Sequence, residues 1–273
     1  MVYMSPRYGA SVCEPRRFGY CNYVPLPIDL DQHFLMPPSE RKAFRAECKQ
    51  RIGWDVNTYT SLTVARNQWR KNYPEIIKAA KLLKLKHPGA FSFVLHCCPV
   101  ESMGWDLPRL IHYYNVGDCV AISDQQVDYD GKNKLFNSAD LFLLPSLGEG
   151  FGIPLIEAAL YELPIFTTDD TANHDLTVLM SCSEHNLPYT AQWQHGPTIP
   201  RPYVCAEEIV KAYESYLQWG CRYNLEKTRK AAEELFTVKK VADTWEGILT
   251  QASTIRLQRF GTNLGLAKGE LSV

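Results

Sequence analysis

Short apolar runs alternate with stretches of helical periodicity through the middle of the chain. Five runs have the length and the β-branched and aromatic content of buried strands: 58–65, 91–98, 118–123, 140–145 and 163–168. Helical patterns separate them, at residues 72–86, 106–114, 132–138 and 153–160. This alternation predicts an α/β fold with a Rossmann-like parallel sheet that is flanked by helices.

The pattern changes in the last third of the chain. Residues 183–204 contain several prolines and are expected to form a surface excursion. From Ala206 onward only helical periodicity remains, at residues 206–219, 221–236 and 237–252. We therefore expect a helical C-terminal segment after the sheet.

The run 139–169 contains the clearest candidate for chemistry. Its apolar strand breaks at residues 145–146, crosses a glycine-rich turn and continues as a helix. Such a turn directs backbone N–H groups and the positive end of the helix dipole toward an anionic ligand. Glu149 lies in the turn and Glu157 about two turns into the helix, and carboxylates accept hydrogen bonds from vicinal hydroxyls. The run predicts a ligand that carries phosphate and sugar together.

Within this run, the segment PSLGEGFGIPLIEAA closely resembles the E-x7-E signature of retaining GT-B glycosyltransferases, especially those of family 4. The resemblance implies that Glu149, the catalytic candidate, contacts the donor sugar and that Glu157 binds the nucleotide ribose. It also implies that Gly150, Phe151 and Gly152 bring the loop backbone close to the donor. Both glutamates are expected to point into a solvated cleft, so that substituting them leaves the fold intact.

Three further segments resemble the hinge, the first strand and helix, and the terminal helix of the C-terminal domain in the same family: 24–34, 62–80 and 234–249. In the first strand and helix of the family, an arginine and a lysine five residues apart bind the donor diphosphate. By this resemblance Arg66 and Lys71 hold the diphosphate. Arg70 competes with Lys71 for the role of main phosphate contact.

The resemblance also divides the chain. It gives an N-terminal segment with the interdomain hinge at 1–36, a nucleotide-sugar-binding Rossmann-like domain at 37–252 and a C-terminal tail at 253–273. A GT-B active site lies between two Rossmann domains, and this chain begins at the hinge. We therefore expect one half of a GT-B fold, whose N-terminal Rossmann domain belongs to a longer form of the chain or to another polypeptide.

Two classes of function follow from the sequence. The first is the donor-binding half of a retaining, metal-independent glycosyltransferase that uses a nucleoside-diphosphate sugar. The alternative is a non-catalytic nucleotide-sugar-binding module or a subunit of a two-chain enzyme; a sugar epimerase of related fold also stays open. The resemblance implies that the nucleotide base is recognised near residues 123–125. The base, the donor sugar and the acceptor stay unspecified.

The composition limits which classes of binding partner and cofactor we expect. A net charge of −1 gives no electrostatic reason to expect nucleic acid, and no apolar run approaches the roughly 20 residues that span a bilayer. Nine cysteines without a C-x-x-C pair favour a cytoplasmic protein, with Cys97 and Cys98 as small core residues of a strand. The D-x-D segments at 29–31 and 128–130 are expected to be turns or helix caps. Neither a metal nor another cofactor is therefore expected.

Overall fold

A five-stranded parallel sheet forms the centre of the molecule. The computed structural model describes residues 2–3, 22–192 and 201–260. The sheet strands are β3 (Tyr59–Val64), β4 (Phe91–His96), β5 (Val120–Ser123), β6 (Leu141–Leu144) and β7 (Ile165–Thr167). Their order across the sheet is β5-β4-β3-β6-β7, and every neighbouring pair is parallel. This arrangement confirms the predicted Rossmann-like fold.

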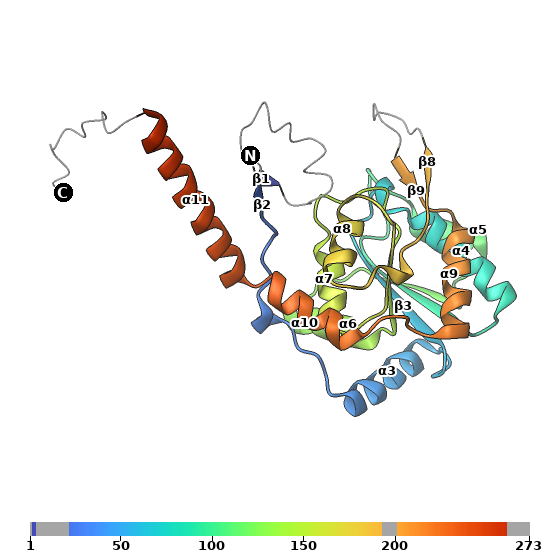
Figure 1. Ribbon diagram of the computed structural model, residues 1–273. Coiled ribbons are helices and arrows are strands. Elements are labelled where there is room, and N and C mark those ends of the chain that lie inside the picture. The colour runs from blue at the N-terminus through green and yellow to red at the C-terminus, as the bar shows by residue number, and fades with distance from the viewer. Residues whose placement is uncertain (1, 4–21, 193–200, 261–273) are drawn as a thin grey trace, which may run out of the picture.

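Helices cover both faces of the sheet (Figure 1). They are α4 (Tyr73–Lys86), α5 (Leu107–Tyr114), α6 (Tyr129–Ser138), α7 (Ile153–Leu160), α8 (Thr171–Leu179), α9 (Ala206–Trp219) and α10 (Leu225–Leu235). The side chains of β6 alternate between two cores: Leu141 and Leu143 pack with α4, α5 and α9, whereas Phe142 and Leu144 pack with α6, α7 and α10. This period-two alternation of a strand buried on both faces explains its continuous apolar sequence.

Shorter elements complete the described chain. They are the strands β1 (Val2–Tyr3) and β2 (Asn22–Tyr23), which pair in parallel, the antiparallel hairpin β8 (Thr190–Gln192) and β9 (Arg201–Tyr203), and the 3-10 helices η1 (Leu30–Gln32), η2 (Trp69–Lys71) and η3 (Ser183–His185). The hairpin lies within the predicted excursion at 183–204, of which residues 193–200 are outside the described residues. The predicted strand 91–98 was too long, because β4 ends at His96. Cys97 is buried as expected, but Cys98 is exposed.

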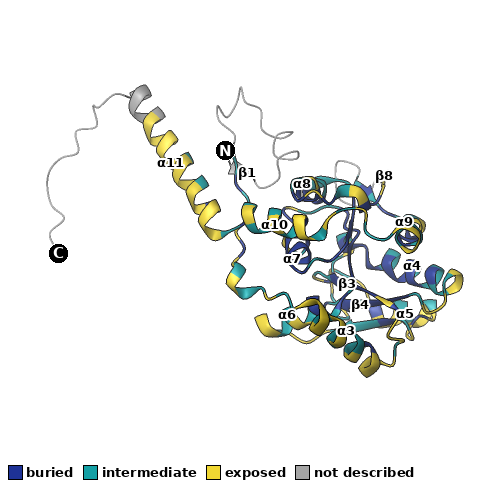
Figure 2. Cartoon of the chain, turned by 60° about the horizontal axis from the view of Figure 1, so that its bottom comes forward, coloured by how far each residue is buried: buried dark blue, intermediate teal, exposed yellow. Residues whose placement is uncertain are grey.

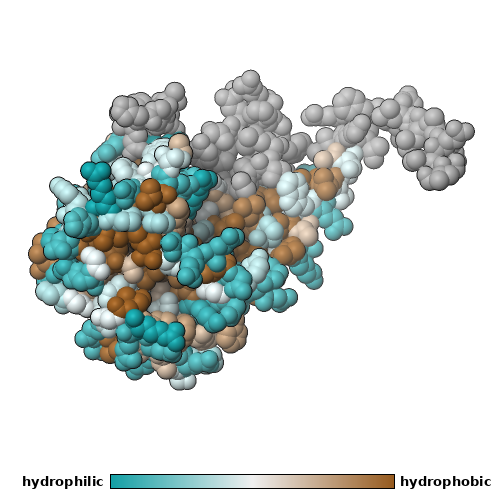
Figure 3. Space-filling model, turned by 180° about the vertical axis from the view of Figure 1, so that it is seen from behind, coloured by the Kyte–Doolittle hydropathy of each residue, from teal (hydrophilic) through white to brown (hydrophobic). Residues whose placement is uncertain are grey.

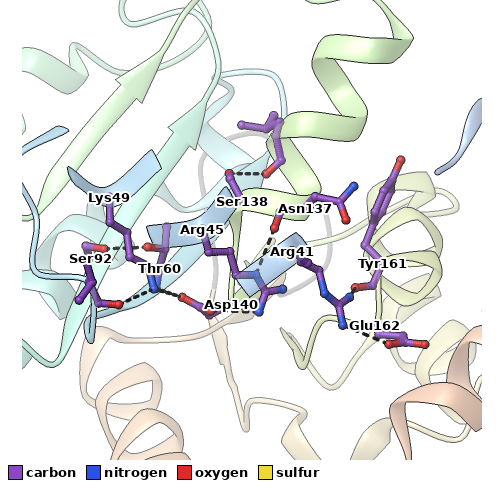
Figure 4. Close-up of polar contacts among 12 residues, drawn as sticks. Arg41, Arg45, Lys49, Thr60, Ser92, Asn137, Ser138, Asp140, Tyr161 and Glu162 are labelled. Atoms are coloured by element: carbon purple, nitrogen blue, oxygen red, sulfur yellow. Dashed lines mark hydrogen bonds and ion pairs between the residues drawn. The ribbon is translucent and has the colours of Figure 1, made fainter. Parts of the chain in front are cut away.

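Helix α3 (Pro38–Ile52) was not predicted, because its sequence is mostly charged and lacks an apolar face. It is held instead by ion pairs at the amino ends of the strands (Figure 4). Lys49 Nζ and Arg45 Nη1 lie 2.7 and 3.1 Å from the carboxylate of Asp140, which also accepts a hydrogen bond from the backbone N–H of Thr60. Arg41 donates to the carbonyl oxygen of Tyr161 at 3.0 Å. The i, i+4, i+8 spacing of these cations places all three on one face of the helix.

The last helix, α11 (Val238–Phe260), projects away from the sheet and is mostly exposed (Figures 1 and 2). It continues past residue 252, where the domain was expected to end; the domain division itself stays a prediction. Its base lies beside the predicted hinge, because the backbone N–H of Ile28 donates to the carbonyl of Phe236 at 2.7 Å. None of the helices in the described part of the chain is long and apolar enough to cross a membrane.

Candidate functional site

The predicted site residues lie at the carboxyl ends of the parallel strands, where α/β sheets bind their ligands. Loop 65–71 follows β3, and the glycine-rich loop 145–152 follows β6. Gly152 begins α7 with φ at 96°, and a Cβ there would lie 3.2 to 3.4 Å from Leu155, Leu176 and Asn173. Only glycine fits this position without strain, so the loop can turn directly into the helix.

Glu149 is the anionic centre of a buried cluster in this loop. Its carboxylate lies 2.5 Å from Nζ of Lys71 and 2.9 Å from Nη1 of Arg70, which also donates to the carbonyl of Gly148 at 2.7 Å. Burial alone would raise the pKa of Glu149, but the charges of Lys71 and Arg70 outweigh it and lower that pKa. Glu149 is therefore ionised, and it holds both candidate phosphate cations at the loop.

Glu157 occupies the second half of the site on α7. Its carboxylate forms an ion pair with Lys132 of α6, and the side chain of Glu157 is only 5% exposed. Both residues line an open pocket of about 430 Å³, together with residues 123–125 after β5 and His96 at the end of β4. One pocket thus contains both residues 123–125, where we expected base recognition, and Glu157, which we expected to bind the ribose.

His96 is neutral in this pocket. Burial and the nearby charge of Lys132 lower the pKa of His96 below its ordinary value. Its Nδ1 lies 3.0 Å from Oγ of Ser123, at the end of the neighbouring strand. The pocket therefore offers the carboxylates of Asp124 and Glu157, the cations of Arg66 and Lys132, and the imidazole of His96 to a ligand.

The side chains of Arg66 and Phe151, both predicted site residues, are placed so that neither joins the buried ion pairs of the site. Arg66 lines the same pocket, but its guanidinium pairs with Glu101 and its side chain is 67% exposed. The ring of Phe151 packs edge-on against Phe236 in the core, so only the backbone of Phe151 is available to a donor. Gly150 has open space around its Cα, so a ligand can approach its backbone.

The expectation of a solvated position was wrong for Glu149, and Glu157 is also largely buried although it lines the open pocket. Their side chains are 7% and 5% exposed, for Glu149 and Glu157, and each forms an ion pair with a lysine. Burying a carboxylate is costly unless it is paired, which explains why both carry a cationic partner. Substitution of either residue is therefore expected to affect stability as well as binding.

Lys132 was not identified as a site residue from the sequence. No spacing links it to Glu157, because the two meet only when α6 packs beside α7. The aspartates of the two D-x-D segments act as predicted: Asp29 caps η1 by accepting from the N–H of Asp31, and Asp128 caps α6 by accepting from the N–H of Gly131.

A second pocket of similar size, about 460 Å³, lies at the opposite edge of the sheet, beside α3. It is lined by Arg41, Arg45 and Lys49, which are paired with the acidic side chains or carbonyls described above. Its lining contains neither Glu149 nor Glu157 and lacks the first residues of α7, Ile153 and Pro154, which line the other pocket. The glutamate-lined pocket is therefore the better candidate site.

Residues 44–178 match the family model of glycosyl transferases group 1. No curated protein matches the chain. Among solved structures, sucrose-phosphate synthase from Thermosynechococcus elongatus aligns with a TM-score of 0.68 and 20% identity, over 93% of this chain and 58% of the synthase. The glycosyltransferase WaaG, involved in lipopolysaccharide biosynthesis, aligns with a TM-score of 0.63 and 18% identity, over 86% of this chain and 59% of its own.

Alr3699/HepE of Anabaena, in complex with UDP and glucose, aligns with a TM-score of 0.64 and 14% identity, over 93% of this chain and 62% of its own. The chain thus spans about three fifths of the length of these structures. The match begins after the hinge segment and includes both loops of the site. This chain has the fold of the C-terminal domain of a GT-B glycosyltransferase, and its residues 44–178 match the family model of glycosyl transferases group 1.

Proposed function

We propose that this chain supplies the donor-binding half of a retaining, metal-independent glycosyltransferase that uses a nucleoside-diphosphate sugar. The observation that carries the proposal is the pair Glu149 and Glu157, each paired with a lysine, on a glycine-rich loop and helix at the carboxyl edge of the sheet. Solved structures of similar fold that contain UDP or ADP support it.

Each part of the site has a role in this proposal. The ribose hydroxyls donate to Glu157, whose partner Lys132 is 30% exposed and can turn toward solvent or phosphate. Arg66, Lys71 and the backbone of the glycine-rich loop bind the diphosphate. Glu149 positions the donor sugar above this loop, so that the reacting carbon faces the acceptor side.

The reaction then breaks the bond between the anomeric carbon and the diphosphate oxygen, and forms a bond from the same carbon to the acceptor oxygen. As the first bond breaks, the diphosphate oxygen gains negative charge and accepts the proton that the acceptor hydroxyl loses. Cations that contact this charge stabilise the transition state more than the ground state. The basic residues after β3 would supply that stabilisation without a metal or another cofactor.

A second Rossmann-like domain, in the same or another chain, would supply the acceptor side. Helix α11 and the hinge leave the domain together, and α11 exposes Val238, Trp245 and Leu249, whose side chains are 55%, 41% and 60% exposed. Figure 3 shows hydrophobic surface on this projecting part of the molecule. Apolar side chains at such a site favour a protein partner. A subunit of a two-chain enzyme is therefore the second candidate function, and the cysteine content favours the cytoplasm as its location.

Calorimetric titration of the chain with UDP, GDP and ADP tests the proposal, with magnesium in one series and a chelator in the other. We expect at least one diphosphate to bind weakly in both series, because only the donor side of the cleft is present. Absence of binding by all three at millimolar concentration would contradict the donor-site assignment. Binding that needs magnesium would contradict the metal-independent mechanism, and robust sugar transfer by the chain alone would contradict the need for a second domain.

A further inference from the structure

The β8–β9 hairpin places an additional arginine against the glycine-rich loop. Arg201 is the first residue of β9 and pairs with Gln192 of β8. Its Nη1 lies 3.3 Å from the position that a Cβ on Gly148 would take. The guanidinium therefore contacts the loop residue directly before Glu149, although it comes from a segment more than fifty residues further along the chain.

Arg201 has no partner in the described part of the chain that would account for its position. Its Nε is buried without a hydrogen bond, and no ion pair involves its guanidinium within that part. Arg70 and Lys71, by contrast, both contact the carboxylate of Glu149. Three cationic side chains thus meet at one short loop, and the carboxylate of Glu149 pairs with only two of them.

A second unpaired polar side chain lies at the other end of the loop. Asn173, in the first turn of α8, is fully buried, and neither its Oδ1 nor its Nδ2 has a hydrogen-bond partner among the described residues. Its Oδ1 lies 3.4 Å from the Cβ position of Gly152. Folded proteins satisfy most buried polar groups, and the exceptions are frequently found at functional sites. Unpaired groups at both ends of residues 148–152 indicate that this loop faces a polar ligand.

We propose that Arg201 binds the donor diphosphate, at the phosphate that carries the sugar, on the side of the loop opposite to Arg66. This inference rests on the proposed function. An excess of positive charge selects an anion, and the planar guanidinium fork matches two phosphate oxygens better than a lysine would. The loop backbone between Gly148 and Gly152 adds N–H donors to the same ligand. Arg201 thereby extends the set of basic residues after β3 with a contact from the hairpin.

Calorimetric titration of the full chain and of Arg201→Ala with UDP, GDP and ADP tests this assignment. The corresponding monophosphates, the nucleosides and inorganic phosphate serve as further probes. Loss of a charge-assisted hydrogen bond is expected to weaken diphosphate binding by about tenfold or more, and to leave nucleoside binding unchanged. The diphosphate affinity of Arg201→Lys should lie between those of the unchanged chain and Arg201→Ala, because lysine keeps the charge and loses the planar fork.

Arg51→Ala is the matched control. Arg51 lies on α3 at the opposite edge of the sheet, its side chain is 73% exposed, and it pairs with Glu47 one turn away. Its removal changes the net charge by the same amount and should leave affinity unchanged. Thermal unfolding followed by circular dichroism checks that each variant is folded, and Arg201→Gln replaces Arg201→Ala if the latter is not.

Different outcomes separate this inference from the proposed function. If the unchanged chain binds no nucleoside diphosphate, both are overturned. If it binds one and Arg201→Ala binds it equally well, the Arg201 assignment alone is overturned. If Arg201→Ala weakened the binding of monophosphate and of diphosphate equally, Arg201 would lie at the phosphate next to the ribose. That result would overturn the assignment to the sugar-bearing phosphate. If Arg201→Ala weakened only the binding of inorganic phosphate, Arg201 would belong to a separate anion site, and the assignment would be overturned as well.

Discussion

Glu149→Gln should destabilise the fold, because it removes the carboxylate that pairs with the buried Lys71. The two side chains are 7% and 9% exposed, and Nζ of Lys71 lies 2.5 Å from Oε1 of Glu149. Removing one partner of a buried ion pair typically costs about 3–5 kcal/mol, because the remaining charge stays out of water. Arg70, the other partner of Glu149, is 37% exposed and can be resolvated. We therefore expect the lower end of the range, about 3 kcal/mol.

Urea denaturation at pH 7, followed by circular dichroism, measures this change as a shift in midpoint at constant slope. Lys71→Met and the double variant Lys71→Met/Glu149→Gln complete a double-mutant cycle. The double variant should cost less than the sum of the single variants, by about 2 kcal/mol. Glu47→Gln is the control of identical chemistry, because its pair with Arg51 is exposed and should contribute less than about 1 kcal/mol.

Equal midpoint shifts for Glu149→Gln and Glu47→Gln, or an additive cycle, would show that the buried pair of Glu149 and Lys71 does not stabilise the fold. Acidification provides an independent check on the unchanged chain. Because the pKa of Glu149 is lowered in the folded protein, its contribution to stability is present at neutral pH and is lost as the pH falls through that lowered value. Glu149→Gln should lack this part of the acid dependence.

Three further predictions concern the other groups. Glu157→Ala should weaken nucleoside diphosphate binding by about five- to hundredfold, as calorimetry would show, because two ribose hydrogen bonds lose their acceptor; unchanged affinity would argue against the ribose role. Arg66→Ala should weaken diphosphate binding far more than nucleoside binding, and an equal effect on both would exclude a phosphate contact. Burial and Arg222 lower the pKa of His185 from 6.5 to about 4, so the folded state excludes a proton that the unfolded chain binds. Stability should fall by about 3 kcal/mol as the pH drops from 6.5 to 4, and His185→Phe, which keeps an aromatic ring against Phe166, should flatten that decline.

The sheet and the glycine-rich loop could be predicted because both depend on local sequence. The buried strands carry continuous apolar runs, and the segment around Glu149 contains its turn residues, its glutamates and its helix start within one short stretch. Helix α3 could not be predicted in the same way. Its stability comes from ion pairs with Asp140 and from a hydrogen bond to a carbonyl of residue 161. The hydrophobic pattern of the helix itself does not indicate either partner.

The side chains that contact the site residues also could not be predicted from the sequence. Lys132 reaches Glu157 through the packing of α6 beside α7, and Arg201 reaches Gly148 through a hairpin that follows the last sheet strand. Both contacts join residues more than twenty positions apart, in segments without a shared motif. The buried ion pairs of Glu149 with Lys71 and of Glu157 with Lys132 likewise depend on tertiary packing, which is why an open, solvated position was expected for both glutamates.

The central claim is that nucleoside diphosphate binds at the carboxyl edge of the sheet. Chemical-shift mapping of the labelled chain during titration with UDP, GDP or ADP tests it most directly, because it distinguishes the proposed pocket from the pocket of similar volume at the opposite edge of the sheet. We predict that the largest changes fall on the backbone amides of residues 148–153 and on those of His96 and Ser123. Changes confined to α3 and residues 56–59, or spread evenly over the surface, would contradict the account.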